Sequence, residues 1–110
     1  MLQEQIARLR ELLDKDPEDA LGWLALGQNL IDLEQADEAV DVLRRAVELK
    51  PDHIDSHRDL GLALLESGNP MEAAEVFARA IGLAEKNQDH QTGRKIHHFL
   101  RRAEKYLSQS

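Results

Sequence analysis

Two histidines in the segment HIDSH are spaced so that they could bind a metal ion. His53 and His57 lie four residues apart, and on a helix this spacing places both rings on one face. Two imidazoles in this arrangement can chelate Zn²⁺ or Ni²⁺, and Asp52 and Asp55 are close in sequence. Two ligands without a clear third do not make a typical site. The sequence therefore favours a structural role for both histidines and predicts no bound metal.

The residue types that carry nucleophilic, acid–base or phosphate chemistry lack the arrangements that enzymes use. The six glycines form neither G-x-G-x-x-G nor a P-loop. The serines have no nucleophile-elbow context. Carboxylates are plentiful, but the helical pattern predicts that they lie on solvent faces. We therefore expect neither catalysis nor a cofactor.

A basic stripe near the C-terminus could contact an anionic partner. Arg94, His98, Arg101 and Lys105 are spaced so that they share one face of a helix. Such a stripe could touch nucleic acid or an anionic membrane. The stripe also has an explanation that needs no partner. Cations stabilise the C-terminal end of a helix, and the last helix of a helical array needs a polar outer face. Because the rest of the chain is acidic, we expect neither nucleic acid nor a membrane as partner.

The composition indicates one helical domain. The chain has 110 residues, of which 42% are hydrophobic, and its aromatic residues are Trp23, Phe77, Phe99 and Tyr106. A core of Leu, Ala, Val and Ile suits helices packed on helices. The absence of cysteine excludes disulfides and thiolate metal sites. No signal-like or bilayer-length apolar stretch occurs, so the expected location is cytoplasmic.

The net charge of −7 is distributed unevenly. Residues 1–85 contain 8 Lys/Arg against 19 Asp/Glu, a balance of −11. Residues 86–110 contain 6 against 2, a balance of +4. The sequence thus predicts an acidic body and a basic final helix.

An internal repeat organises the chain, because residues 20–53 align without a gap with residues 54–87. The identities fall at helical spacing, which composition alone would not produce. Each unit is predicted to contain two helices, at about 19–33 and 36–49 and again at about 53–67 and 70–84. The identical pairs are Leu26/Leu60, Gly27/Gly61, Leu30/Leu64, Glu38/Glu72, Ala39/Ala73, Val42/Val76, Arg45/Arg79, Ala46/Ala80 and Leu49/Leu83.

Glycines occupy two special places in this repeat. Gly27 and Gly61 are predicted to let the two helices of a hairpin approach closely, with the small residues Ala39, Ala46, Ala73 and Ala80 facing them. Gly68 suits the left-handed position that ends a helix. Glu34 stands at the same place in the first unit, where a side chain costs on the order of 1 kcal/mol. We therefore expect that turn to be built differently or more loosely.

The pattern W-x2-L-G-x2-Y…A-x3-F…A…P, recurring with the period of this alignment, resembles the tetratricopeptide repeat. In the first unit Trp23, Leu26, Gly27, Leu30, Ala39, Leu43, Ala46 and Pro51 occupy the slots of this pattern. In the second unit Leu60, Gly61, Leu64, Gly68, Ala73, Phe77 and Ala80 occupy them, with His57 in the Trp slot and Glu85 in the Pro slot. The resemblance implies an all-α, right-handed superhelix of antiparallel helix hairpins.

The resemblance also implies a division of the chain into one domain of four parts. Residues 1–16 are predicted to form an N-terminal half-repeat, 19–52 and 53–86 two full repeats, and 89–107 a C-terminal capping helix. Co-chaperones of this family hold a terminal carboxylate with Lys, Asn and Arg. That clamp is absent here, because its positions are Leu24, Gln28, Asp59, Asp89 and Gly93.

The family lines a concave groove with the first helix of each repeat, and the same stripe follows from helical spacing. The predicted function is a scaffold that binds a peptide or helix segment of another protein, apolar with basic flanks, between apolar anchors and an acidic rim at Asp32 and Glu66. The other interpretation of this stripe is that part of it belongs to the core. The groove residues are Leu21, Leu24, Gln28, Ile31, Asp55, Arg58, Leu62, Leu65, Ile96 and Phe99.

An alternative function is homo-oligomerisation through the C-terminal amphipathic helix. Ile96, Phe99, Leu100 and Tyr106 could pair across a two-fold axis of a homodimer. An acidic body and a basic final helix could also attract each other between protomers.

Overall fold

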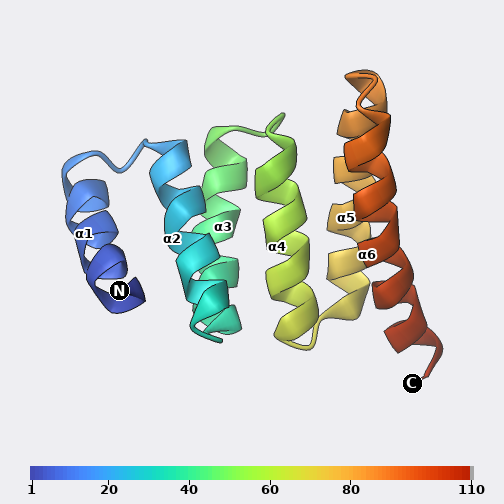
Figure 1. Cartoon of the computed structure of the whole chain (residues 1–110), viewed down its shortest axis with the longest axis horizontal. Coiled ribbons are helices and arrows are strands. Elements are labelled where there is room, and N and C mark those ends of the chain that lie inside the picture. Colours follow the sequence, from blue (N-terminus) through green and yellow to red (C-terminus); the bar gives the residue numbers. More distant parts are fainter. Residues whose placement is uncertain (110) are drawn as a thin grey trace.

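The computed structural model describes residues 1–109, in which six α-helices are joined by short turns. Figure 1 shows the helices in chain order along the longest axis of a molecule measuring 40 × 32 × 21 Å. The predicted all-α class is confirmed, and each helix ends within two residues of its predicted limits. The helices are α1 (Leu2–Lys15), α2 (Ala20–Asp32), α3 (Ala36–Leu49), α4 (Ile54–Glu66), α5 (Pro70–Lys86) and α6 (His90–Ser108).

The six helices form two layers. Each helix packs on its neighbours in sequence, and α4 also contacts both α2 and α6. In Figure 1, α2, α4 and α6 lie in front of α3 and α5. Within residues 1–109, the backbones of α1, α3 and α5 do not come into contact with one another. The array is therefore curved, with α2, α4 and α6 on the inner side; we call these the inner layer and the other three the outer layer.

Gly27 and Gly61 provide the close approach that the sequence predicted, but the facing residues differ from the prediction. A Cβ atom at Gly27 would lie 2.4 Å from Cγ of Leu43, and one at Gly61 would lie 2.4 Å from Cε1 of Phe77. The nearest facing side chain at each glycine is therefore large, where the sequence predicted alanine. Removing the side chain from the inner helix makes room for a large residue on the outer helix.

The turns from an inner to an outer helix share one geometry, so the expectation of a different turn at Glu34 is also wrong. Glu34 adopts a left-handed φ of 60° and Gly68 one of 89°. In both turns the next N–H donates back to the helix, from Gln35 to the Leu30 carbonyl at 2.9 Å and from Asn69 to the Leu64 carbonyl at 2.8 Å. This pair of features is the Schellman ending of a helix. Its hydrogen bonds hold Glu34 in a conformation that glycine adopts more easily.

The first two loops from an outer to an inner helix are closed by a ring N–H. Nε1 of Trp23 donates to the Pro17 carbonyl at 2.8 Å. Nε2 of His57 lies 2.6 Å from the Pro51 carbonyl and donates to it, because a carbonyl oxygen can only accept. His57 thus makes in the second unit the hydrogen bond that Trp23 makes in the first.

The third loop of this kind departs from the repeat. Helix α5 has 17 residues where α3 has 14, and it continues through Glu85, where the first unit has Pro51. It ends in a Schellman turn at Gln88, with a φ of 58°. As a result α5 and α6 form a long hairpin with the most extensive helix–helix packing in residues 1–109.

The core lies between the two layers. Every helix contributes large apolar side chains to it, and buried alanines of α3, α4, α5 and α6 fill the spaces between them. Among residues 1–109, none of the helices has the length and apolar composition that crossing a lipid bilayer requires. The largest fully buried apolar side chains are Leu26, Leu30, Leu43, Leu64, Phe77 and Ile96.

Candidate peptide-binding groove

All ten residues predicted to line the groove lie on the inner layer. The curvature of the array brings α2, α4 and α6 next to one another in that order. Helix α2 carries four of the ten, α4 carries four and α6 carries two: Leu21, Leu24, Gln28 and Ile31; Asp55, Arg58, Leu62 and Leu65; Ile96 and Phe99.

Three of these residues belong to the core. Leu24 is 7% exposed, Leu65 is 9% exposed and Ile96 is 0% exposed. The expectation that they are open to a partner is wrong, because all three are part of the hydrophobic core cluster. The interpretation of part of this stripe as core holds for these positions. Substituting them would disturb folding before it disturbed binding.

The remaining apolar members differ in accessibility. Leu21 is 54% exposed at the beginning of α2, whereas Ile31, Leu62 and Phe99 are partly buried against the core. The ring centroid of Phe99 lies 5.9 Å from that of Phe77 in the core. Phe99 is therefore held in place from below and keeps part of its ring at the surface.

A polar network joins α2 to α4 in the middle of the inner layer. The amide of Gln28 donates to one carboxylate oxygen of Asp59 at 2.8 Å, and Nε of Arg58 donates to the other at 3.1 Å. Arg58 also contacts Asp55 through its Nη1 at 3.2 Å. Asp59 is 5% exposed, so its burial is compensated by two hydrogen bonds. The sequence did not predict this role for Asp59, because its partners lie partly on another helix.

A cavity of about 450 Å³ opens between α4 and α6. Leu62 and Phe99 supply an apolar floor, and basic side chains stand around it. The sequence did not indicate Lys95 as a groove residue, because it lies one position away from the predicted stripe that contains Ile96 and Phe99. The residues that line the cavity are Arg58, Leu62, Thr92, Lys95, Ile96, His98 and Phe99.

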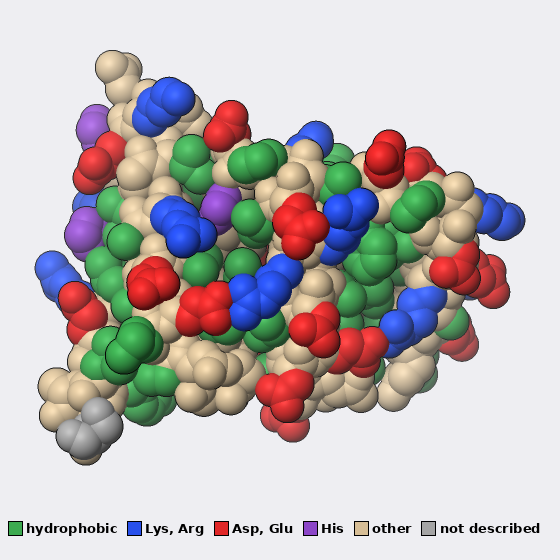
Figure 2. Space-filling view, turned by 180° about the vertical axis from the view of Figure 1, so that it is seen from behind, with side chains coloured by type: hydrophobic (Ala, Val, Ile, Leu, Met, Phe, Trp, Pro, Cys, Tyr) green, Lys and Arg blue, Asp and Glu red, His purple; other side chains and the backbone are tan. Residues whose placement is uncertain are grey.

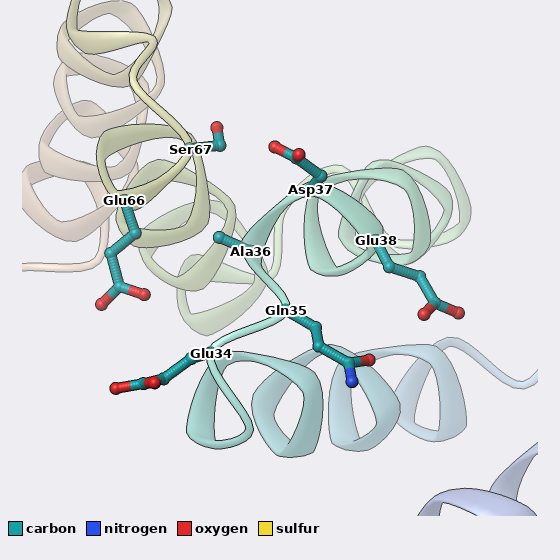
Figure 3. Close-up of a pocket in the computed structure, with 7 residues that line it drawn as sticks. All are labelled: Glu34, Gln35, Ala36, Asp37, Glu38, Glu66 and Ser67. Carbon is teal, nitrogen blue, oxygen red and sulfur yellow. The ribbon is translucent and has the colours of Figure 1, made fainter.

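An acidic rim lies at the other side of α4. The C-terminal ends of α2 and α4 meet the start of α3 there, around a hollow of about 510 Å³. Figure 3 shows the carboxylates of Glu34 and Glu66 directed to the same side of this hollow, with Asp37 on its far side. Glu38 points away and pairs with Arg10 at 2.5 Å. We call Asp32, Glu34 and Glu66 the acidic rim.

The start of α6 is fixed by Asp89. Its carboxylate accepts a hydrogen bond from the backbone N–H of Thr92 at 3.1 Å, which caps the helix. Hydrogen bonds from Thr92, first its side chain and then its backbone, lower the pKa of the Asp89 carboxyl. The cap fixes the start of α6, whose first two turns carry Thr92 and Lys95.

The outer layer is joined by ion pairs that repeat with the period of the chain. Arg10 of α1 pairs with Glu38 of α3 at 2.5 Å, and Arg44 of α3 pairs with Glu72 of α5 at 2.5 Å. The hydrogen bonds from Arg44 lower the pKa of Glu72, against a smaller opposing effect of burial. Figure 2, which views the side opposite to Figure 1, shows acidic and basic side chains intermixed over this surface.

The two histidines of the HIDSH segment bind protein groups on different sides. Nδ1 of His53 lies 2.9 Å from the hydroxyl of Ser56, while His57 bonds to the Pro51 carbonyl. Within residues 1–109, no group of three His, Cys, Asp or Glu side chains is placed to hold a metal ion. The arrangement gives both histidines a structural role.

The basic stripe of Arg94, His98, Arg101 and Lys105 lies exposed on α6. The apolar surface available for pairing two copies through this helix is smaller than the sequence suggested, because Ile96 is buried. Tyr106 is its one strongly exposed large apolar side chain within residues 1–109. The homodimer remains a prediction.

Known proteins resemble this chain in sequence over most of its length. Residues 2–92 match the family described as the cytochrome c-type biogenesis protein H TPR domain. A peroxisomal targeting signal receptor of Candida albicans is 37% identical over 67 residues, which are 61% of this chain and 11% of the receptor. The TPR repeat-containing protein PA0015 of Pseudomonas aeruginosa is 27% identical over 100 residues, which are 91% of this chain and 95% of that protein. The chain thus spans only a small part of the peroxisomal receptor.

Solved structures share the fold. The Bordetella parapertussis protein BPP2914 superposes with a TM-score of 0.78 at 26% identity, over 92% of this chain and 88% of that one. The TPR2B domain of yeast Sti1, in complex with pHsp70, gives 0.85 at 20% identity over 92% and 81% of the two chains. PcrH, in complex with the chaperone binding region of PopD, gives 0.88 at 17% identity over 96% and 80%.

The internal repeat, the glycine-mediated hairpins and the curved inner layer agree with the sequence match over residues 2–92. The chain therefore belongs to the family of the cytochrome c-type biogenesis protein H TPR domain.

Proposed function

We propose that this chain binds a segment of another protein on its inner layer and acts by binding rather than by catalysis. One observation carries the proposal: in the cavity between α4 and α6, Leu62 and Phe99 remain partly exposed beside polar side chains. A concave, partly apolar surface with a few polar groups is typical of a site that takes the apolar anchor of a ligand. Proteins of the same fold give further support, since PcrH is described with a region of PopD and the Sti1 domain with pHsp70.

The proposed segment is apolar with a basic flank. Its apolar side chains contact Leu62 and Phe99, and its Lys or Arg residues face the acidic rim. Opposite charges at the edge of an interface favour one orientation of the partner more than they add affinity. Because the family is named for cytochrome c-type biogenesis, peptides from proteins of that process are the first to test. The cytoplasmic location remains a prediction, which fractionation of the source cells tests.

The test compares two substitutions that each replace an accessible apolar side chain by aspartate, one in the cavity and one on the opposite layer. Leu62→Asp places a charge on the floor of the cavity, whereas Met71→Asp places it on the outer layer, where Met71 is 67% exposed. Proteins are captured from source lysate with the wild type and both variants and identified by mass spectrometry. Overlapping peptides of the captured proteins are then titrated in a fluorescence anisotropy assay.

We expect at least one peptide that binds the wild type and Met71→Asp with equal affinity and binds Leu62→Asp much more weakly. Both variants should keep the helical circular dichroism spectrum of the wild type. The loss should exceed tenfold, roughly 1.4 kcal/mol or more, because a buried unpaired charge is costly. Equal binding by wild type and Leu62→Asp, or no captured segment at all, would contradict the proposal.

A further inference from the structure

The cavity between α4 and α6 combines an apolar floor with a basic edge. Leu62 comes from α4 and Phe99 from α6, and both are partly buried while Ile96 is fully buried at the same place. The centroid of the His98 ring lies 6.1 Å from that of Phe99, so a basic group stands directly beside the apolar surface. The volume, about 450 Å³, lies in the range of sites that enclose a small ligand.

The basic side chains at this cavity differ in how far they are already paired. Arg58 is bonded to Asp55 and Asp59, so its charge is compensated within the protein. Lys95 forms no ion pair within 4 Å in residues 1–109. No Asp or Glu is among the described residues that line the cavity. Among the Lys and Arg side chains that line the cavity, Lys95 is therefore the one without an ion pair, and its charge interacts only through space with Asp89 at the start of α6.

This charge continues along α6. Arg102, Lys105 and Tyr106 border a second hollow, of about 320 Å³, further along the helix. Residues His90–Ser108 contain 5 Lys/Arg and 3 His against a single acidic residue, Glu104. Since the remainder of the chain is strongly acidic, α6 is the helix that attracts a negatively charged partner rather than repelling it.

The side chains of Lys95 and His98 are exposed, whereas Ile96 between them is buried. The α6 edge of the cavity therefore presents charged and polar groups to a ligand, above an apolar floor.

We propose that the cavity between α4 and α6 binds a large apolar side chain of a partner segment together with a neighbouring Asp or Glu. The apolar side chain rests on Leu62 and Phe99, and the carboxylate pairs with Lys95 beside His98. This inference rests on the proposed function and extends it. The proposed function places a basic part of the segment at the acidic rim, and the inference adds an acidic residue in the part of the segment that lies over α6. A segment that pairs with both the acidic rim and Lys95 has basic residues over α2 and α4 and an acidic residue over α6. These two charges fix the direction in which the segment lies on the protein.

A selection from random peptides tests the inference without a known partner. Peptides are displayed with their C-terminus fused to the carrier, so that only side chains supply carboxylates. They are selected on four forms of the full chain: wild type, Lys95→Glu, Leu62→Asp and the matched control Lys50→Glu. Lys50 is exposed directly after α3, far from α6 in sequence.

The expected wild-type peptides contain a large apolar residue with an Asp or Glu nearby, and Lys50→Glu selects the same pattern. Lys95→Glu should select Lys or Arg at the acidic position and bind the wild-type peptides up to about fivefold more weakly, the range of an exposed ion pair. High salt should remove most of that difference.

Three other outcomes overturn the inference. The first is that the peptides selected by the wild type are not enriched in Asp or Glu, and the second is that the peptides selected by Lys95→Glu keep the same enrichment. Either result would overturn the inference. The proposed function would remain intact if Leu62→Asp still abolished selection. Selection of no peptide by the wild type would overturn both.

Discussion

At the scale of single residues, the most constrained positions are two glycines beneath large side chains. Leu43 lies over Gly27, and Phe77 lies over Gly61, so close that an added Cβ could not fit without displacement. Glycine normally weakens a helix by about 1 kcal/mol relative to alanine. Here that cost is offset because the large side chain of the outer helix is completely buried.

Gly61→Ala and Gly82→Ala should change stability in opposite directions. At Gly61 the new methyl group would lie 2.4 Å from the ring of Phe77, and such overpacking costs about 1–3 kcal/mol. At Gly82, also within a helix, it would meet no atom within 4 Å in the described part of the chain. There alanine should stabilise by about 0.5–1 kcal/mol through helix propensity. Urea unfolding measures both, and destabilisation by both variants alike would refute this account.

The sequence predicted which residues have a constrained place in the fold more reliably than it predicted which residues they contact on other helices. The period of the repeat identified Gly27 and Gly61 as points of close approach, yet alanine was expected opposite them. Spacing along one helix fixes which residues share a face, but the pairing across a hairpin also depends on the crossing of the two helices. The same limit hid the contact of Gln28 with Asp59, which joins α2 to α4.

At the scale of helices and turns, the backbone repeats more faithfully than the residue types do. Glu34 and Gly68 end their helices with the same left-handed turn, although one is charged and the other has no side chain. The strain at Glu34 can be predicted from the residue type, but the two backbone hydrogen bonds that offset this strain depend on the geometry of the whole turn. At α5 a change of residue type does change the backbone. Glu85 replaces the proline of the first unit, and the helix continues through it.

The ion pair between α3 and α5 should make stability depend on pH. The pKa of Glu72 is lowered in the folded state by hydrogen bonds from Arg44. The pair therefore contributes stability above the unfolded pKa of about 4.3, and this contribution is lost as the pH falls through the lower folded value. Because both side chains are about 40% exposed, Glu72→Gln should cost no more than about 0.5–1 kcal/mol at neutral pH.

The measurement is thermal unfolding of wild type and Glu72→Gln over a series of pH values, with Glu75→Gln as the control. Glu75 lies on the same helix and is exposed. The difference between wild type and Glu72→Gln should shrink as the pH falls below about 4. A difference that stays constant down to the lowest pH would show that the pair does not cause it.

At the scale of the whole molecule, the packing follows the order of the chain. Each helix depends mainly on its sequence neighbours, so local opening can begin at an end without disrupting the middle. The two ends are not equivalent. The interface of α1 with α2 is the smallest between consecutive helices in residues 1–109, whereas α6 packs on α5 along the long hairpin.

Backbone amides of α1 should therefore exchange with deuterium sooner than those of α4 and α5, while amides in the first half of α6 should be protected. The buried Ile96 lies in that protected half. Two-dimensional NMR spectra recorded after transfer to D₂O give this order residue by residue. Equal exchange of α1 and the first half of α6 would indicate simple fraying of both ends instead.

The separation of charge along the molecule has a consequence for the rate of encounter. The acidic rim lies at the C-terminal ends of α2 and α4, and the basic side chains of α6 lie further along an axis of 40 Å. At physiological salt, fields fade over a Debye length of about 8 Å. A segment of the proposed kind therefore meets two local fields, one for each of its ends, and not the −7 of the whole chain. Adding salt should slow its arrival and leave its departure nearly unchanged, because the time it remains bound is set by Leu62 and Phe99.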